Sequence, residues 1–431
     1  MKIISLKDQP LETVLESLRR PVAETALLEE TVTSVFTGVR QSGDSALLDY
    51  TLRFDKANLN TIRVSEDEIA EAGSQVSPDL KQAISRAIEN VETFHRSQIM
   101  EEKIVGTMPG VWCWQRSLPI EKVGLYIPGG TAPLFSTVIM LAVPARVASC
   151  GETILCTPPR RDGTVDPAIL WTASVTGVKS IFKVGGIQAI AAMAFGTESV
   201  PRVDKIFGPG NQWVTAAKQM ASKEGIAIDL PAGPSEVMIV ADETAVPAFV
   251  ASDILSQAEH GDDSQAVLVT TSASLPVEVM QEIERQLTSL ERQKTIKKAL
   301  ANSAVVVVNN TDEAVMVMNA YAPEHLILSV ADPDGMASRV VNAGSVFLGN
   351  YSPESAGDYA SGTNHTLPTN GFARGWSGVS LDSFMKKITF QNITPSGLMK
   401  LGPVVETMAR AEQLDAHANA VRVRINEISK Q

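Results

Sequence analysis

The stretch VGLYIPGG, residues 123–130, begins the region whose pattern is most informative about the fold class. Its first five residues are apolar or aromatic without alternation, and a proline–glycine turn follows them. Strands that are apolar on both faces occur in parallel sheets that are covered by helices on both sides. The stretch therefore predicts the first strand of an α/β layer.

Short apolar runs of this kind recur through the chain, and the segments between them carry apolar residues at helical spacing. The runs lie at residues 153–156, 180–184, 205–207, 226–230, 236–241, 266–270, 304–308, 326–330 and 345–348. Strands that alternate with helices form parallel sheets in α/β layers. We predict two such units, with a boundary near residue 235.

The flanking parts of the chain have a different pattern. Residues 1–20 form a short amphipathic arm, and the part up to residue 122 is mostly helical, with a short strand at 62–64 and Ser65 as a helix N-cap. One long helix is predicted at 403–428. Either terminal element can pack on a partner subunit or on its own chain, and the pattern leaves both open.

Composition limits the class of protein. The chain has 431 residues, 44% of them hydrophobic, and a net charge of −12, so nucleic acid and anionic membranes are poor partners. Three cysteines fit a reducing compartment without disulfides. The longest strongly apolar run, residues 138–145, is too short to span a membrane. We expect a soluble, cytoplasmic protein.

A candidate metal site lies at the end of the helix predicted for residues 246–260, in the sequence SQAEHG. Gln257 and His260 are three residues apart and share one face of its last turn. An amide oxygen and an imidazole are half of a plausible zinc site, although such a pair is common by chance. Gly261 is where a left-handed helix cap is expected.

A candidate acid–base pair, Glu324 and His325, precedes the predicted strand at 326–330. A carboxylate beside an imidazole suits proton transfer, because histidine titrates near working pH. The alternative is an exposed surface pair. His95, next to Phe94 on a predicted helix, is interpreted as structural.

A polar loop, residues 355–365, follows the last predicted strand. Asp358 is a candidate metal ligand and His365 a candidate donor to a ligand, because ligands collect at the carboxyl ends of strands in open α/β sheets. Ordinary turn residues are the alternative.

Glu412 and His417 lie on the predicted last helix, about 140° apart. They can flank one ligand, and a solvated helix face is the alternative.

Glycine turns at 129–130, 185–186 and 208–210 each follow a predicted strand, so each can let the backbone approach a phosphate. None has the dinucleotide fingerprint G-x-G-x-x-G.

Taken together, these stretches resemble the histidinol dehydrogenase family over nearly the whole chain. The strongest parts are VGLYIPGGTAPLFSTVIMLAVPA, DKIFGPGNQWV, LPAGPSEV, LSQAEHG, APEHL, GDYASGTNH and EQLDAH. The resemblance implies two incomplete Rossmann-like domains plus small terminal arms that exchange across a homodimer. The expected division is 1–20 as the N-terminal arm, 21–122 with 236–380 as the first α/β domain, 123–235 as the second, and 381–431 as the C-terminal helical arm.

The resemblance also implies an activity: zinc-assisted oxidation of L-histidinol by NAD to L-histidine, through a bound aldehyde, in the last two steps of histidine biosynthesis. The implied roles are shared among a small set of positions. Zinc ligands are Gln257, His260, Asp358 and His417. The general base is His325, and Glu324 activates water. Substrate contacts are the four zinc ligands, His325, Ser235 and Glu412, and NAD contacts are Tyr126, Gln188 and Asn211. Glu412 and His417 would complete the site of the partner subunit.

Two other classes of protein use similar residues. A zinc hydrolase would need the same ligands and no NAD, and a metal-dependent binding protein would hold an imidazole ligand without turnover. The Gly-Trp-Ser segment at 375–377 is atypical for the resemblance but lies outside the expected chemistry.

Overall fold

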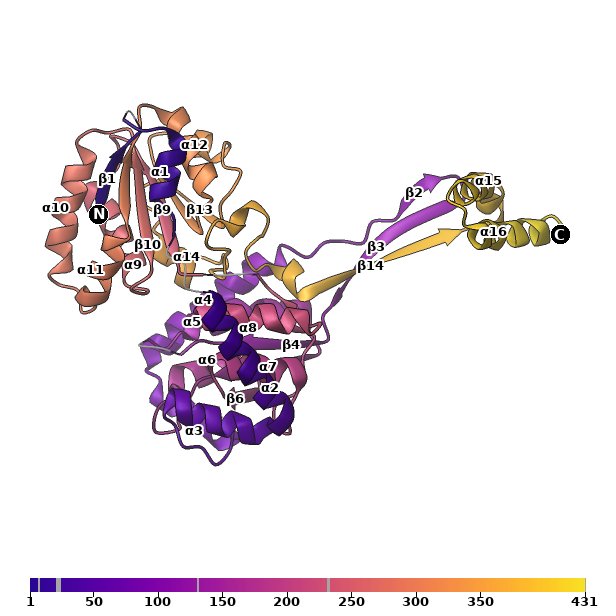
Figure 1. Cartoon of the computed structure of the whole chain (residues 1–431), viewed down its shortest axis with the longest axis horizontal. Coiled ribbons are helices and arrows are strands. Elements are labelled where there is room, and N and C mark those ends of the chain that lie inside the picture. Colours follow the sequence, from indigo (N-terminus) through magenta and orange to yellow (C-terminus); the bar gives the residue numbers. More distant parts are fainter. Residues whose placement is uncertain (7, 21–24, 130–131, 231–232, 431) are drawn as a thin grey trace. The chain divides into compact units, whose positions relative to one another are not determined.

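The computed structural model describes residues 1–6, 8–20, 25–129, 132–230 and 233–430. These residues form an α/β protein with two parallel sheets, as predicted, and a small antiparallel sheet (Figure 1). The chain divides into a larger unit, Met1–Gln98 with Ile120–Phe384, and a smaller unit, Ile99–Pro119 with Met385–Gln431. Each unit is described by itself.

The first parallel sheet of the larger unit has six strands in the order β1-β11-β10-β9-β12-β13. Its strands are β1 (Lys2–Ser5), β9 (Glu236–Ala241), β10 (Gln265–Thr270), β11 (Ala304–Val307), β12 (His325–Ser329) and β13 (Ser345–Leu348). The helices that connect and cover them are α1 (Leu11–Ser17), α9 (Pro247–Ala258), α10 (Leu275–Leu287), α11 (Gln293–Ala301), α12 (Thr311–Tyr321), α13 (Pro333–Ala337) and α14 (Glu354–Tyr359).

The strand β9 explains why the apolar runs of this sheet do not alternate. Val237 and Ile239 face a core formed with α9, α10 and α11, whereas Met238 and Val240 face a second core formed with α1 and α12 (Figure 1). Because both faces of the strand are buried, every position after the first, Glu236, is apolar. Each such side chain contributes about 1.5–3 kcal/mol relative to an exposed one.

The second parallel sheet has five strands in the order β6-β5-β4-β7-β8. They are β4 (Lys122–Tyr126), β5 (Glu152–Thr157), β6 (Ser180–Lys183), β7 (Lys205–Phe207) and β8 (Ala227–Ile228). Between them run α5 (Phe135–Ala148), α6 (Pro167–Thr176), α7 (Gly186–Phe195) and α8 (Gln212–Lys223). The predicted strands and helices of this region match these bounds within about three residues.

The N-terminal helices α2 (Thr25–Tyr50), α3 (Glu66–Gln75) and α4 (Pro78–Arg96) lie with this second sheet. α2 packs into the same core as Ile154 and Phe182, which is a different grouping from the one expected for residues 21–122. The domain boundaries themselves stay a prediction. Ser65 caps α3 in a capping box with Glu68, as predicted. The strand predicted at 62–64 is only a single bridge from Arg63 to Phe182.

Residues 2–6 and 8–18 pack against the six-stranded sheet of their own chain. Ile4, Val14 and Leu18 are buried in the core that contains Met238 and Val240. Of the two alternatives that the sequence left open for the N-terminal arm, this is packing on its own chain. Among the helices of the described residues, none combines the length and the apolar character that a membrane-spanning segment requires.

The smaller unit contains an antiparallel sheet in the order β14-β3-β2, which the sequence analysis did not predict. β2 (Val105–Met108), β3 (Val111–Pro119) and β14 (Met385–Ile393) are largely exposed or half-buried. Without one fully buried face, these strands have no clean alternation of apolar and polar residues, and that alternation is the main signal for a half-buried strand.

The single long helix predicted at 403–428 is wrong. The structure has two helices, α15 (Pro395–Ala411) and α16 (Asp415–Ile428). They are separated at Gln413, which adopts a left-handed conformation with φ of 60°. No glycine or proline lies at this break, so the sequence pattern predicted one continuous helix across it. The two helices pack closely at Gly402, where an added Cβ would lie 2.4 Å from Ile425.

Candidate active site

A cavity of about 300 Å³ in the larger unit collects most of the residues expected to carry chemistry. Its lining includes Ser235, His260, Glu324, His325 and Asp358. These residues come from segments separated by up to about 120 positions. A cavity with convergent polar and ionisable groups is the usual form of a small-molecule site.

The carboxyl end of α9 positions Gln257 and His260. Gln257 is fully buried, and neither its amide oxygen nor its amide nitrogen has a hydrogen-bond partner among the described residues. α9 ends at Ala258, and His260 lies just beyond it. Gly261 is not left-handed, so the predicted cap is wrong. The helix instead closes with a tight turn, in which the His260 N–H donates to the Gln257 carbonyl at 3.3 Å.

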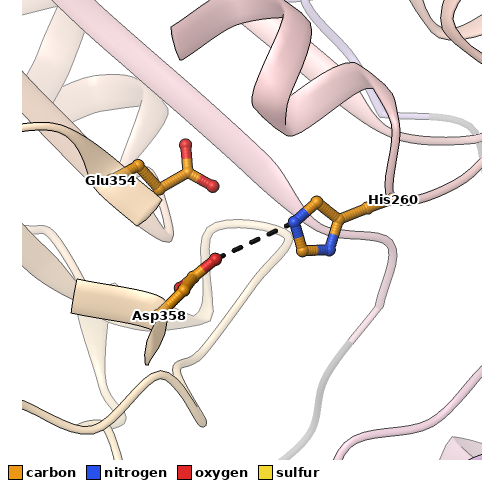
Figure 2. A group of neighbouring side chains, drawn as sticks. All are labelled: His260, Glu354 and Asp358. Carbon is orange, nitrogen blue, oxygen red and sulfur yellow. Dashed lines mark ion pairs between the residues drawn. The ribbon is translucent and has the colours of Figure 1, made fainter. Parts of the chain in front are cut away.

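Three side chains converge to form a candidate metal centre. One ligand atom each of His260, Glu354 and Asp358 lies within 4.8 Å of the other two (Figure 2). His260 Nε2 is 3.8 Å from Asp358 Oδ2. Imidazole nitrogen and carboxylate oxygen are zinc donors. Gln257 precedes His260 by three residues. Its buried side-chain amide has no hydrogen-bond partner among the described residues, although buried amides normally have one.

Glu354 was not predicted from the sequence. It begins α14 after Pro353, and this pattern is typical of an ordinary helix start. Its carboxylate is fully buried with no hydrogen-bond partner among the described residues, and burial raises its pKa well above the usual value. Only the tertiary structure brings it to the site, so no sequence signal could have found it.

His325 is the centre of the acid–base groups. Its Nδ1 lies 3.3 Å from the carbonyl oxygen of Glu236, and its Nε2 lies 3.5 Å from Asp358 Oδ1. A proton on Nδ1 satisfies the carbonyl and leaves Nε2 as the basic nitrogen. Burial disfavours the charged imidazole, but the carboxylates of Glu354, Glu324 and Asp358 outweigh it and raise the pKa of His325 well above its usual value.

The carboxylate of Glu324 accepts two hydrogen bonds from neighbouring groups. The Ser235 hydroxyl donates to its Oε2 at 2.7 Å, and the Glu236 N–H donates to the same oxygen at 2.9 Å. Burial raises the pKa of Glu324 to about 7. A carboxyl group with that pKa can bind and release a proton near neutral pH, as a catalytic base must.

Asp358 lies in α14, within the segment that was predicted as a polar loop. Burial alone would raise its pKa, but the imidazoles of His325, His365 and His260 outweigh burial and lower it to about 2. His365 also lines the cavity, as its predicted role requires, and its Nδ1 lies 2.8 Å from the Asp358 carbonyl oxygen. His95 is fully buried away from this site, and burial lowers its pKa to about 4.

The location expected for Asp358 and His365 was partly wrong. They were predicted at the carboxyl ends of strands, but the site that they join lies at the amino ends of β9 and β12, whose first residues are Glu236 and His325. The amino ends of these parallel neighbours lie together because Val237 pairs with His325. α14 then brings Glu354 and Asp358 back to this edge.

The carboxyl ends of the other sheet border a second cavity of about 450 Å³. Tyr126 and Asn211, two of the predicted cofactor contacts, line it. The Tyr126 hydroxyl accepts the Gly186 N–H at 3.1 Å, and Asn211 Oδ1 caps α8. Gln188 is buried in α7 and lines neither cavity.

The glycine turns of this edge are tightly packed. An added Cβ at Gly129 or Gly185 would lie 2.2 or 2.4 Å from Pro158, and one at Gly208 would lie 2.1 Å from the Tyr126 carbonyl oxygen. Only glycine fits these positions without displacing the neighbouring chain. Gly130 of the first predicted turn lies outside the described residues.

Glu412 and His417 belong to the smaller unit. They were expected on one helix, about 140° apart, but Glu412 follows the end of α15 and His417 lies in α16. The predicted angle between them is therefore wrong. Their roles in a partner's site stay a prediction.

Ionisable groups with shifted pKa values that line one cavity are typical of an active site, and here they occur in an α/β fold, as in an enzyme of that class. Comparisons with known proteins specify which kind. The family model for histidinol dehydrogenase matches residues 18–425. The histidinol dehydrogenase of Bacteroides fragilis is 59% identical over 430 residues, covering 100% of both chains. That of Salmonella typhimurium is 49% identical over 417 residues, covering 96% of this chain and 95% of the relative.

A solved structure of histidinol dehydrogenase from Elizabethkingia anophelis is 52% identical. It superimposes with a TM-score of 0.97 and covers 100% of this chain and 99% of that one. The chain belongs to the histidinol dehydrogenase family and is an oxidoreductase that acts on histidinol in histidine biosynthesis.

Proposed function

We propose that the chain oxidises L-histidinol to L-histidine in two successive steps, with NAD as oxidant, zinc as a bound metal and L-histidinaldehyde as a retained intermediate. One observation carries the proposal. The acid–base pair Glu324–His325 and the donors His260 and Asp358 line one cavity. Both oxidations remove protons from groups on the same carbon, so one base beside one binding site can serve both.

Zinc fits the residues that are present. Gln257, His260 and Asp358 would hold it, together with His417 from a partner subunit, and the buried unpaired amide of Gln257 is the observation that supports this set. Bound zinc would orient the imidazole and amino groups of the substrate and add positive charge near His325. Glu354, the third member of the observed cluster, would remain beside the substrate or the metal.

NAD fits the second cavity. Among the described residues the Tyr126 hydroxyl only accepts, from the Gly186 N–H, so its proton stays free for a ligand. Asn211 keeps its amide N–H₂ for a ligand, because its oxygen caps α8. Pro128 and Asn211 line both cavities, so the two adjoin. NAD would accept a hydride from the substrate carbon in each step.

His325 would remove the hydroxyl proton of histidinol in the first step. Its Nε2 is buried and has no hydrogen-bond partner among the described residues, while Nδ1 faces the Glu236 carbonyl. In the second step Glu324 would take a proton from water as that water adds to the aldehyde, and His325 would take the hydroxyl proton of the resulting hydrate. Keeping the aldehyde in the cavity would protect a reactive amino aldehyde from the solvent.

The stoichiometry of the reaction tests this scheme. Purified protein supplied with histidinol and excess NAD should form two NADH for each histidine, measured by absorbance and by amino-acid analysis of the same sample. One NADH per product would reject the four-electron scheme. A zinc hydrolase would form neither NADH nor histidine from histidinol, because hydrolysis oxidises nothing. Histidinol binding without turnover would indicate a binding protein.

We also propose a homodimer with shared active sites. The smaller unit, which carries Glu412 and His417, exposes many large apolar side chains, and such surfaces mark interfaces. They are Ile99, Met100, Ile104, Val105, Trp112, Ile388, Met399, Val404, Met408, Leu414 and Val423.

The three cysteines are free, and this fits the proposed location in the reducing cytoplasm.

Mixing two inactive variants tests the shared site. His260→Ala and His417→Ala chains should each lose zinc and activity. After subunit exchange, heterodimers should regain one intact site and therefore about half of the wild-type activity per dimer. A mixture of each variant with itself is the control. Heterodimers that form but remain inactive would contradict a site built from two chains.

A further inference from the structure

Asp55 is an ionisable group of the second cavity that the proposed chemistry does not use. It ends a single π-helical turn, Thr51–Asp55, which continues α2, and Lys56 then turns the backbone with a φ of 60°. Single π turns often occur at functional sites. This turn carries the Asp55 carboxylate to a cavity formed mainly by the ends of β4 and β5.

The Asp55 side chain is half-buried, and one of its two carboxylate oxygens has no partner. This oxygen, Oδ2, is inaccessible and has no hydrogen-bond partner in the described part of the chain. Burial raises the pKa of Asp55 to about 6, and among the described residues no hydrogen-bond donor or cation opposes the shift. An unpaired buried carboxylate destabilises a fold. A group that costs stability and touches a cavity is a candidate for ligand binding.

The other polar groups of the cavity complement a nucleotide. Arg160 and Arg161 lie on its rim, and Arg160 is paired with Asp166. Arginine suits phosphate. Beside them, the glycine backbone near Gly129 and Gly186 lets a ligand approach closely. A dinucleotide also has ribose hydroxyls, and those require an acceptor.

We propose that Asp55 accepts hydrogen bonds from the hydroxyl pair of a ribose of the dinucleotide. The inference rests on the proposed use of NAD and adds a residue to it. An acidic side chain fills this role in dinucleotide-binding α/β folds, where it follows the second strand. Here the acidic residue belongs to a helical segment that precedes the strands of the sheet. Its position in the sequence therefore differs from the usual one and does not predict this role. Both riboses of the cofactor offer the hydroxyl pair.

The test measures equilibrium binding without turnover. NADH and NADPH are titrated by fluorescence into wild-type protein and into Asp55→Ala, Asp55→Asn and Asp49→Asn variants, with thermal unfolding recorded for each. Asp49 is exposed on α2 and lines neither cavity, so its variant removes one charge from the same helix without touching the site. Asp55→Ala should raise the Kd for NADH by about 10- to 100-fold, as the loss of a charged hydrogen-bond acceptor predicts. Asp49→Asn should not change it.

Two further readouts sharpen the result. Both Asp55 variants should unfold at the same temperature as wild type or higher at pH 8, because they remove a half-buried charge of which one oxygen has no partner. If Asp55 holds the adenine ribose, the preference for NADH over NADPH should shrink, because the carboxylate repels the 2′-phosphate. If it holds the nicotinamide ribose, the Kd values for both should rise by the same factor.

An unchanged Kd for NADH in both Asp55 variants would overturn the inference and leave the proposed use of NAD intact. A lower unfolding temperature with unchanged binding would likewise overturn it and assign Asp55 a structural role. Wild-type protein that binds neither dinucleotide would instead overturn the proposed cofactor, and the inference with it.

Discussion

The variant His325→Asn should lower kcat for histidinol oxidation by about 10²- to 10⁴-fold, the usual loss when a general base is removed. His325 is 2% exposed, and its Nε2 faces the cavity beside Asp358. Asparagine keeps a hydrogen-bond donor near the Glu236 carbonyl but has no basic nitrogen. Because the proposed base acts in both steps, oxidation of histidinol and of added histidinaldehyde should fall together. Rapid-mixing measurements of NADH formation with each substrate check this.

Glu324→Gln is the matched comparison. Glutamine can still accept from Ser235 and the Glu236 N–H, so the local structure should persist. Histidinaldehyde oxidation should fall far more than histidinol oxidation, because only the second step needs activated water. In wild type, that step should also weaken as pH falls below about 7, where the Glu324 carboxyl gains a proton. Equal losses in both steps for Glu324→Gln, or a His325→Asn enzyme with normal kcat and normal zinc content, would refute these roles.

The variant Arg20→Met should reduce the free energy of unfolding by about 3–5 kcal/mol. Arg20 makes two hydrogen bonds to the Glu236 carboxylate, at 2.5 and 2.7 Å, and stacks 3.7 Å above the Tyr321 ring. The side chain of Glu236 is 1% exposed. Without Arg20 its charge is buried and unpaired, which costs far more than the ion pair contributes. Chemical denaturation followed by circular dichroism measures the loss.

The free energy of unfolding that Arg20→Met loses should depend on pH, and the direction follows from the pKa of Glu236. Burial already raises the pKa of Glu236 in the folded protein, and removing Arg20 raises it further. A carboxyl group whose pKa is higher in the folded than in the unfolded state destabilises the fold once the pH rises above the pKa of the unfolded state. The loss should therefore be larger at pH 8 than at pH 5. Arg19→Met is the control, because Arg19 pairs with Glu16 at the surface, where both side chains are exposed, and should cost at most about 1 kcal/mol. Equal effects of the two variants would contradict the argument.

Much of the fold was predictable because its signals are local. The runs at 123–127, 236–241 and 304–308 became β4, β9 and β11, since the interior positions of a strand buried on both faces must be apolar. The Ser65 cap was also predictable, because the cap and its partner lie three residues apart. The smaller unit was not. Its strands are half-exposed, and the break at Gln413 carries no glycine or proline.

For the site, the chemical groups available could be read from the sequence: an amide, imidazoles and carboxylates in short motifs at the ends of helices and strands. Which of these groups meet follows from the folded structure. It placed His260 3.8 Å from Asp358, and it added Glu354 to the metal cluster and Asp55 to the second cavity, two acids that no motif marked. The physical reason is that local pattern reports periodicity and capping, whereas burial and pairing depend on segments that the fold brings together from far along the chain.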